Sequence, residues 1–314
     1  MKKRLKDLKD ILRGIFLLAL CAVFFIGVTP MKFAYADETK LLETKNGTTN
    51  VRIIGENGPS VVFETGYADA IITEDKDIWN GVQDNVAKYS KTISYDRFGL
   101  GKSSDIGNMP SLSDKERDVI LNGGYIKYNK NNFEGQYKTA RDKAINLHNV
   151  LEKANIKKPY VLVAHSIGSL TVIEFSKLYK NDVAGIIMLD GTPPDINSQM
   201  YKWSKAKGSN FAEESFSQLT NQDGNMDEVL VSGLQCQKDL KSLKNIPILY
   251  LQASDEGFGE EFNQLWEGCI VNMLSNFKSS KRIVVPNSTH YVHKDNPDFV
   301  NDAIKNFIDE ISFR

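Results

Sequence analysis

The chain contains a serine, several acidic residues and a late histidine in an order that suits nucleophilic catalysis. Ser166 lies in Ala164-His165-Ser166-Ile167-Gly168, directly after the apolar residues 160–164. This pattern differs at one position from Gly-x-Ser-x-Gly, the nucleophile elbow, because alanine replaces the first glycine. The positions two before and two after the serine need small residues, because the chain turns sharply there from a strand into a helix. We therefore expect Ser166 to be a nucleophile; the alternative is an ordinary strand-to-helix junction.

A serine nucleophile needs a base within hydrogen-bond reach, and that base needs an acid to orient it. His290 lies just after the last expected strand and is the expected base, with His293 as the alternative. His165 precedes the nucleophile, and we expect it to pack or form a hydrogen bond beneath the turn.

Two loops offer the acid. Asp255 follows the expected strand 246–251, with Glu256 directly beside it, and Asp190 follows the expected strand 183–189. Both loops fit the order serine, acid, histidine, with each residue at the carboxyl end of a strand. Asp255 is our first expectation, Asp190 the second candidate, and Glu256 the candidate that remains if neither acts.

The tetrahedral oxyanion of acyl transfer needs two main-chain donors. The N–H of Ile167 follows the nucleophile, and the N–H of Tyr67 follows Gly66 in the loop after the expected strand 60–64. Another glycine-containing segment, residues 96–103, lacks the upstream glycine of a phosphate-binding loop. We expect it to shape the pocket floor, with Asp96 and Arg97 in structural hydrogen bonds.

The elements that position these residues alternate between strands and helices. Further strands are expected at residues 51–55, 91–95 and 282–285, and helices at residues 74–90, 114–121, 136–154 and 168–179. Two more helices are expected, around residues 262–270 and at the end of the chain. This alternation predicts an α/β fold with a mostly parallel sheet covered on both faces. Residues 195–243 interrupt it and are interpreted as an inserted cap.

The first 36 residues differ from the rest of the chain. Residues 1–6 are basic, residues 15–28 are apolar, and Ala34-Tyr35-Ala36 offers a cleavage site. We expect a signal peptide, so that the protein is secreted, or alternatively an N-terminal membrane anchor. Removal of this segment changes the net charge from −1 to −6, so binding to anionic lipid by charge alone is not expected.

Composition narrows the range of functions. A pI near 6.5 and the lack of a basic patch with interleaved aromatic residues argue against nucleic-acid binding. No cysteine or histidine cluster has the spacing of a metal site, so neither a metal nor another cofactor is expected. Cys236 and Cys269 are either a disulfide or two buried thiols.

Four motifs in order give the chain a resemblance to the α/β-hydrolase superfamily. They are residues 63–67, residues 95–103, the elbow around Ser166 and the segment from Thr289 to Pro297. The resemblance covers nearly the whole chain after residue 36, and it implies eight mostly parallel strands with a cap after the sixth. Thr65 stands where many members have histidine, and Ala164 replaces a glycine. Neither change removes a catalytic atom, because the oxyanion donors are main-chain groups.

The resemblance and the candidate triad together imply a secreted serine hydrolase that cleaves a carboxylic ester through an acyl-enzyme on Ser166. Its partner is a small-molecule acyl substrate, and the sequence does not indicate an oligomeric state. Six aromatic residues are candidates for the pocket lining: Tyr67, Trp79, Phe98, Tyr201, Trp203 and Phe211.

Two other functions remain open. The first is hydrolysis of an amide or peptide bond, as in an aminopeptidase whose cap binds a free amine. The acidic residues that suit an amine are Glu213, Glu214, Asp223, Asp227 and Glu228. The second, of a different class, is a non-catalytic protein that binds a small molecule on the same fold.

Overall fold

The structure is a computed structural model that describes residues 37–73, 76–127 and 135–312. The expected signal peptide, residues 1–36, lies outside the described residues. Within them, no helix combines the length and the apolar character that crossing a membrane requires.

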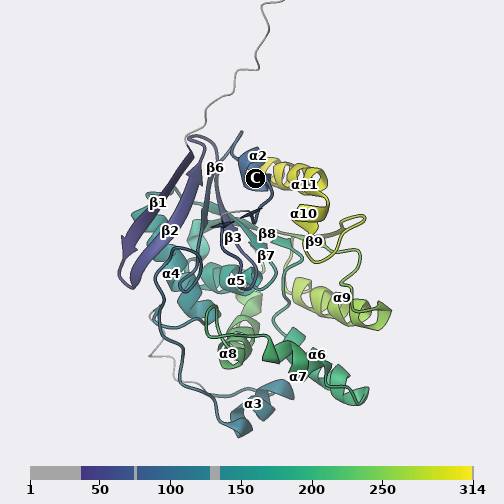
Figure 1. Ribbon diagram of the computed structural model, residues 1–314. Helices are drawn as coiled ribbons and strands as arrows, with labels where there is room; N and C mark the ends of the chain where they lie inside the picture. The colour runs from purple at the N-terminus through teal and green to yellow at the C-terminus, as the bar shows by residue number, and fades with distance from the viewer. Residues whose placement is uncertain (1–36, 74–75, 128–134, 313–314) are drawn as a thin grey trace, which may run out of the picture. The chain divides into compact units, whose positions relative to one another are not determined.

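An eight-stranded sheet forms the centre of the fold (Figure 1). Its order is β1-β2-β6-β3-β7-β8-β9-β10. The strands are β1 (Asp37–Thr44), β2 (Gly47–Ile54), β3 (Ser60–Glu64), β6 (Lys91–Tyr95), β7 (Tyr160–His165), β8 (Val183–Leu189), β9 (Ile248–Gln252) and β10 (Ser280–Val284). Pairing is parallel from β6 to β10 and antiparallel for β1 with β2 and β2 with β6. This confirms the expected mostly parallel α/β sheet.

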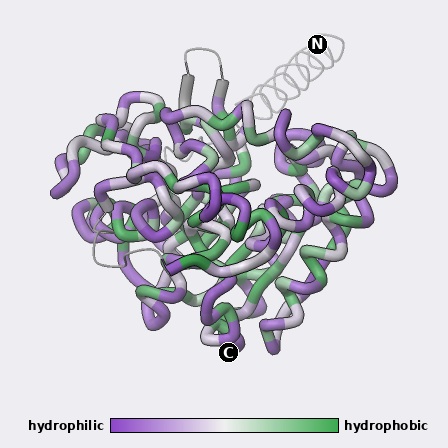
Figure 2. The backbone as a smooth tube through the Cα atoms, turned by 90° about the horizontal axis from the view of Figure 1, so that it is seen from below, coloured by the Kyte–Doolittle hydropathy of each residue, from purple (hydrophilic) through white to green (hydrophobic). Residues whose placement is uncertain are grey.

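Helices cover both faces of the sheet. One face carries α4 (Ala140–Lys153), α5 (Gly168–Leu178) and α8 (Met226–Gln237), which contact one another. The other face carries α2 (Val82–Val86) and α11 (Pro297–Ser312), with α10 (Val292–Asp295) beside α11. Side chains of one strand alternate between the two layers, so Leu162 joins one apolar cluster and Val163 the other. Figure 2 accordingly shows hydrophobic segments in the interior of the fold.

The segment between β8 and β9 contains α6 (Ile196–Ala206), α7 (Phe211–Ser217), α8 and the 3₁₀ helix η3 (Leu240–Leu243). It follows the sixth strand of the large sheet in chain order, where the cap was expected. Helix α8 packs against α4 and α5 and is buried along most of its length. Part of the segment therefore belongs to the helical layer, and a cap function stays a prediction. Two further helices are α3 (Asp114–Leu121) and α9 (Glu260–Leu274).

The expected helix over residues 74–90 is wrong. The short strands β4 (Ile72–Thr73) and β5 (Lys76–Asp77) precede a single helical turn, α2. The Asp77 carboxylate accepts hydrogen bonds from the N–H groups of Trp79 and Gly81, and Asn80 and Gly81 have φ angles of 48° and 76°. Left-handed residues end an α-helix. The apolar spacing in this stretch reflects burial in the core.

Cys236 and Cys269 are free thiols, and both are buried. The Cys236 thiol donates a hydrogen bond to the carbonyl of Leu170 at 3.2 Å. Burial raises the pKa of Cys269 to about 12. Of the two alternatives left open by the sequence, the structure has the buried thiols and not the disulfide.

Candidate active site

Ser166 lies on a sharp turn between β7 and α5, and its φ angle is 52°. The turn is fixed to its neighbours because the Ser166 N–H donates to the carbonyl of Leu189 and its own carbonyl accepts from Thr192. A Cβ atom on Gly168 would lie only 2.5 Å from the carbonyl oxygen of Thr65. Glycine is therefore required at position 168, whereas the methyl group of Ala164 fits inside the core.

Ser166, His290 and Asp190 form a continuous chain of hydrogen bonds. The Ser166 hydroxyl lies 2.8 Å from Nε2 of His290, and Nδ1 of His290 lies 2.7 Å from Oδ2 of Asp190. A neutral imidazole fits this chain: Nδ1–H donates to the carboxylate and Nε2 accepts from the hydroxyl. The arrangement is that of a nucleophile, a base and an orienting acid.

Asp190 is held from two sides. It follows β8 with a φ of 45°, and its side chain is fully buried. Its Oδ1 accepts a hydrogen bond from the N–H of Ala253, and its own N–H donates to the carbonyl of Leu251. These contacts connect Asp190 to the end of β9 and fix the carboxylate against His290.

The expectation that Asp255 is the acid does not agree with this geometry. The exposed Asp255 carboxylate accepts hydrogen bonds from the N–H of Gly257 and the amide of Asn263, which lower its pKa. The next residue lies closer to the base: Oε2 of Glu256 is 3.5 Å from Nδ1 of His290. The turn after β9 thus directs its second acidic residue, and not its first, toward the histidine.

Asp190 and Glu256 together determine the direction in which the pKa of His290 is shifted. Burial alone lowers the pKa of His290, but the hydrogen bonds and charges of Asp190 and Glu256 outweigh it, so the pKa rises. Burial raises the pKa of Glu256 to about 7, and the neighbouring Asp190 adds to the increase. The two acids therefore share one base.

The other expected histidines are tied to main-chain carbonyls. The Nε2 atom of His165 lies 3.0 Å from the carbonyl oxygen of His290, and that of His293 lies 3.1 Å from the carbonyl oxygen of Ile78. Burial lowers the pKa of both, that of His293 to about 3. His293 is therefore buried and neutral, and it is not the residue beside Ser166. His165 lies beneath the elbow, as expected, and supports the loop of His290.

The two expected oxyanion donors are free to bind. Within the described ranges, neither the N–H of Tyr67 nor that of Ile167 donates a hydrogen bond. Ile167 is the N-cap of α5, a position that favours bound negative charge. A Cβ atom on Gly66 would lie 2.6 Å from Nδ1 of His165, so glycine lets this loop approach the elbow.

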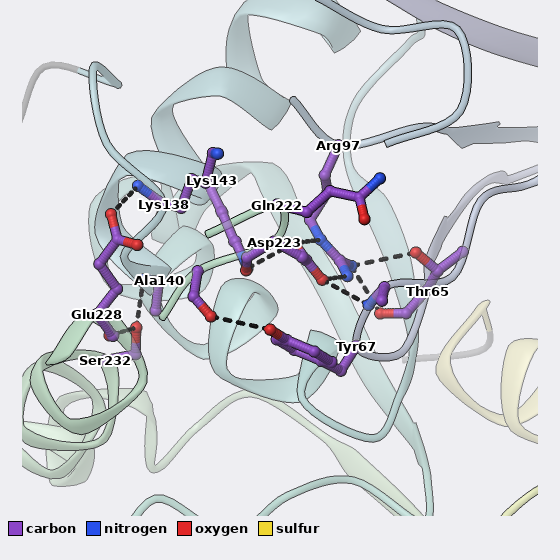
Figure 3. A network of polar contacts seen from close by, with 12 residues as sticks. Thr65, Tyr67, Arg97, Lys138, Ala140, Lys143, Gln222, Asp223, Glu228 and Ser232 are labelled. Carbon is purple, nitrogen blue, oxygen red and sulfur yellow. Dashed lines mark hydrogen bonds and ion pairs between the residues drawn. The ribbon is translucent and has the colours of Figure 1, made fainter. Parts of the chain in front are cut away.

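A buried polar network holds the loop that carries Tyr67 (Figure 3). The Arg97 guanidinium donates to the carbonyls of Thr65 and Gly66 at 2.7 and 2.5 Å. It also pairs with Glu64 and with Asp223, whose carboxylate accepts the N–H of Ala68. The Tyr67 hydroxyl accepts from the N–H of Thr220 at 2.6 Å. The candidate oxyanion loop is thus fastened to residues 220–224 of the inserted segment.

Charges inside this network compensate one another. Arg97 is 2% exposed, and Glu64 and Asp223 are fully buried. Burial alone raises the pKa of Asp223, but Arg97 and Lys143 outweigh it and hold the pKa well below its usual range. Structural hydrogen bonds were expected for Arg97, whereas no local signal in the sequence pointed to its partner Asp223.

The acidic residues considered for an amine-binding cap are mostly engaged elsewhere. Asp223 pairs with Arg97, Asp227 with Arg117 and Glu213 with Lys205. Glu228 accepts the main-chain N–H groups of Met109, Lys138 and Asn225. These carboxylates hold the inserted segment together and do not form an open cluster for a free amine.

Of the six aromatic residues expected to line a pocket, two lie in a cluster of rings that reaches His290. Trp203 and Phe211 contact Phe262, whose ring stacks on Trp266 with centroids 6.1 Å apart. Trp266 lies 6.1 Å from the His290 ring. Trp79 and Phe98 are buried in the core, Tyr201 lies under Lys205, and Tyr67 binds the 220–224 loop.

Comparisons with known proteins agree with this architecture. A family model described as the alpha/beta hydrolase fold matches residues 59–225, more than half of the chain. The uncharacterized protein YqjL of Bacillus subtilis is 25% identical over 279 residues, which cover 87% of this chain and 92% of YqjL.

Two solved structures show how widely this fold is used. The naproxen esterase (carboxylesterase NP) of Bacillus subtilis has a TM-score of 0.56 at 18% identity, over 87% of this chain and 92% of its own. A haloalkane dehalogenase variant from Bradyrhizobium elkanii has a TM-score of 0.57 at 13% identity, over 88% and 98%. Likeness at such low identity concerns the fold alone.

Proposed function

This chain belongs to the α/β-hydrolase fold family, and from that premise we propose that it is a serine hydrolase that cleaves carboxylic esters through an acyl-enzyme on Ser166. One observation carries the proposal. The Ser166 hydroxyl lies 2.8 Å from Nε2 of His290, whose other nitrogen lies 2.7 Å from Asp190. The family and the likeness to esterases support a hydrolytic function in general.

The first half of the proposed reaction is acylation. Oγ of Ser166 attacks the ester carbonyl carbon while its proton passes to Nε2 of His290, and Asp190 stabilises the imidazolium that forms. The carbonyl oxygen becomes an oxyanion, and the N–H groups of Ile167 and Tyr67 donate to it. The intermediate then collapses. The ester C–O bond breaks, His290 returns the proton to the leaving oxygen, and an alcohol departs.

Deacylation repeats these steps with water. His290 removes a proton from a water molecule, which attacks the acyl carbon, and a second oxyanion forms at the same N–H groups. Collapse breaks the bond to Oγ, His290 protonates Ser166, and the carboxylic acid leaves. No further reactant is needed.

An ester is favoured over a peptide with a free N-terminal amine. Recognition of an ammonium group requires an accessible negative charge, and most of the acidic residues that could supply it are bound to other groups. The aromatic rings next to His290 suit an apolar acyl or alkyl group instead. The similar structure from Bacillus subtilis is also named as a carboxylesterase.

Export is a further part of the proposal. The basic residues 1–6, the apolar residues 15–28 and the Ala-x-Ala at residues 34–36 support a secretory signal. Expression of the full chain, followed by N-terminal sequencing of the product in the medium and in the membrane fraction, tests it. Full-length product in the membrane fraction would support the retained anchor.

A fluorophosphonate probe tests the nucleophile directly. We expect the wild type to be labelled and Ser166→Ala to remain unlabelled. Ser176→Ala is the matched control, because Ser176 is another buried serine on α5 and its hydroxyl donates to the carbonyl of Val172. Lack of labelling in the wild type, or equal labelling of Ser166→Ala, would refute the serine mechanism.

A further inference from the structure

A second acid lies beside the candidate triad. Glu256 follows β9, and its Oε2 is 3.5 Å from Nδ1 of His290, the nitrogen that Asp190 also approaches. One side-chain oxygen or nitrogen atom from each of Asp190, Glu256 and His290 lies within 4.8 Å of the other two. The proposed reaction uses Asp190 and gives Glu256 no part.

The position of Glu256 is built into the fold. Its side chain is only 6% exposed, and its N–H donates to the side-chain oxygen of Asn263 on α9. Its other carboxyl oxygen, Oε1, is buried and has no hydrogen-bond partner in the described part of the chain. A buried, incompletely bonded carboxyl costs stability, so chemistry at this site is the natural reason for it.

Two carboxyl groups this close to each other do not both ionise freely. Burial and the nearby charge of Asp190 favour a proton on Glu256. The pKa of Glu256, raised to about 7, places this proton near neutral pH. Below this pKa Glu256 is protonated and His290 faces Asp190 without a second charge; above it, the charge of Glu256 is added beside His290.

We propose that Glu256 is a positioning residue of the triad, which sets the basicity of His290 and substitutes in part for Asp190 when that carboxylate is removed. The proposal rests on the proposed serine-hydrolase function. It assigns the carboxyl pair, and not Asp190 alone, as the acid of the triad.

Few other groups near Glu256 titrate in the same range. Asp190 follows β8 and His290 follows β10. Tyr250 on β9 donates its hydroxyl to the carbonyl of Gly191, and burial raises its pKa well above the usual value. From α9, the thiol of Cys269 has its pKa raised to about 12. Both remain neutral, so a change of charge on Glu256 acts on Asp190 and His290.

The direction of the effect follows from charge. An ionised Glu256 stabilises the imidazolium and raises the pKa of His290, and the base must be neutral to accept a proton. Replacing Glu256 by glutamine removes this charge, so the acid limb of kcat/KM should move to lower pH. A shift of about one pH unit is expected for a charge at this distance.

Four proteins test the proposal: wild type, Glu256→Gln, Asp190→Asn and the double variant, with Glu260→Gln as control. Glu260 is an exposed glutamate at the start of α9. For each, kcat and KM for a 4-nitrophenyl ester are measured across the pH range, with thermal unfolding to confirm the fold. Of the two single glutamate variants, only Glu256→Gln should show the acid limb of kcat/KM shifted to lower pH. The double variant should lose about tenfold more kcat than Asp190→Asn.

Two results would overturn the proposal. One is an equal loss of kcat at every pH in Glu256→Gln without a shift, which is what a structural role alone gives. The other is a double variant no worse than Asp190→Asn. Probe labelling of Ser166 is run on the same samples. If the wild type is not labelled, the proposed serine-hydrolase function is refuted. If it is labelled but the pH profile of kcat/KM is unchanged in Glu256→Gln, only the proposed role of Glu256 is refuted.

Discussion

Arg97 and Asp223 are 126 positions apart in the chain, yet they form a buried ion pair with Nη2 and Oδ2 2.5 Å apart. The pair joins the loop after β6 to the inserted segment. Because Arg97 also binds the carbonyls of Thr65 and Gly66, the same contact fixes the loop whose Tyr67 N–H is the proposed oxyanion donor.

Asp223→Asn should therefore lower both stability and turnover. It leaves Arg97 buried with one acid fewer, and breaking a buried pair typically costs about 3–5 kcal/mol. Urea unfolding measures the loss of stability, and kcat for an ester substrate measures the effect on the oxyanion loop. Asp118→Asn, at an exposed site on α3, is the control. An unchanged free energy of unfolding would show that the pair does not hold the loop.

The choice of acid gives a second prediction. Asp190→Asn should reduce kcat/KM by about 10²-fold, less than the roughly 10⁴-fold typical of a sole triad acid, because Glu256 remains. Asp255→Asn should change kcat/KM less than about twofold, because the Asp255 carboxylate accepts hydrogen bonds from Gly257 and Asn263, and the substitution leaves its main-chain bond to Ser288 in place. Steady-state kinetics of both variants decide the point. A larger loss in Asp255→Asn would reverse the assignment.

The elbow gives a third prediction. In Gly168→Ala the new Cβ would lie 2.5 Å from the main-chain oxygen of Thr65, which cannot move without shifting the oxyanion loop. We expect a loss of about 1–3 kcal/mol in stability together with a loss of activity. Ala164→Gly adds no atom and is the matched control. Comparison of thermal unfolding and kcat should separate the two variants, and equal behaviour would argue against the crowded turn.

Buried histidines predict how stability depends on pH. Burial lowers the pKa of His165 and brings that of His293 to about 3, whereas an unfolded histidine titrates near about 6.5. Below about pH 6.5 the unfolded chain binds protons that the folded chain does not. The contribution of these residues is therefore complete above that pH and is lost as the pH falls, by about 1.4 kcal/mol per unit for each histidine.

Urea unfolding at several pH values between about 7 and 5 measures this slope. His293→Gln should have a shallower slope than the wild type, since one of the two buried bases is gone. The raised pKa of Glu256 acts in the opposite direction in both proteins, so the comparison between them is the test, and a slope unaffected by the substitution would contradict the neutral state of His293.

Local patterns predicted much of this molecule. Strands β3, β6, β7, β8, β9 and β10, Ser166 on its elbow and His290 near the end of the chain follow from short apolar runs and from small residues at fixed spacing. Each depends on neighbours in sequence. The helix expected over residues 74–90 failed because one side chain, Asp77, stabilises a turn that the apolar spacing does not reveal.

The acid and the ion pairs depend on contacts between distant segments. Asp255 and Glu256 are adjacent in the same turn, and the sequence does not say which of them faces His290. Asp223 was considered as a ligand for a substrate amine because its partner Arg97 lies in another element. Such pairings depend on how loops meet at the sheet edge, and a single sequence does not encode them in any local pattern.

Ser166 and Asp190 are the nucleophile and the nearest acid of the proposed triad, and both have left-handed backbone angles, with φ of 52° and 45°. This conformation costs a side-chain-bearing residue about 1–3 kcal/mol, and glycine adopts it with little cost. Ser166→Gly and Asp190→Gly should relieve that strain while abolishing or reducing the reaction. Selection for stability alone would replace these residues with glycine. Their presence therefore indicates selection for the proposed chemistry at the expense of stability.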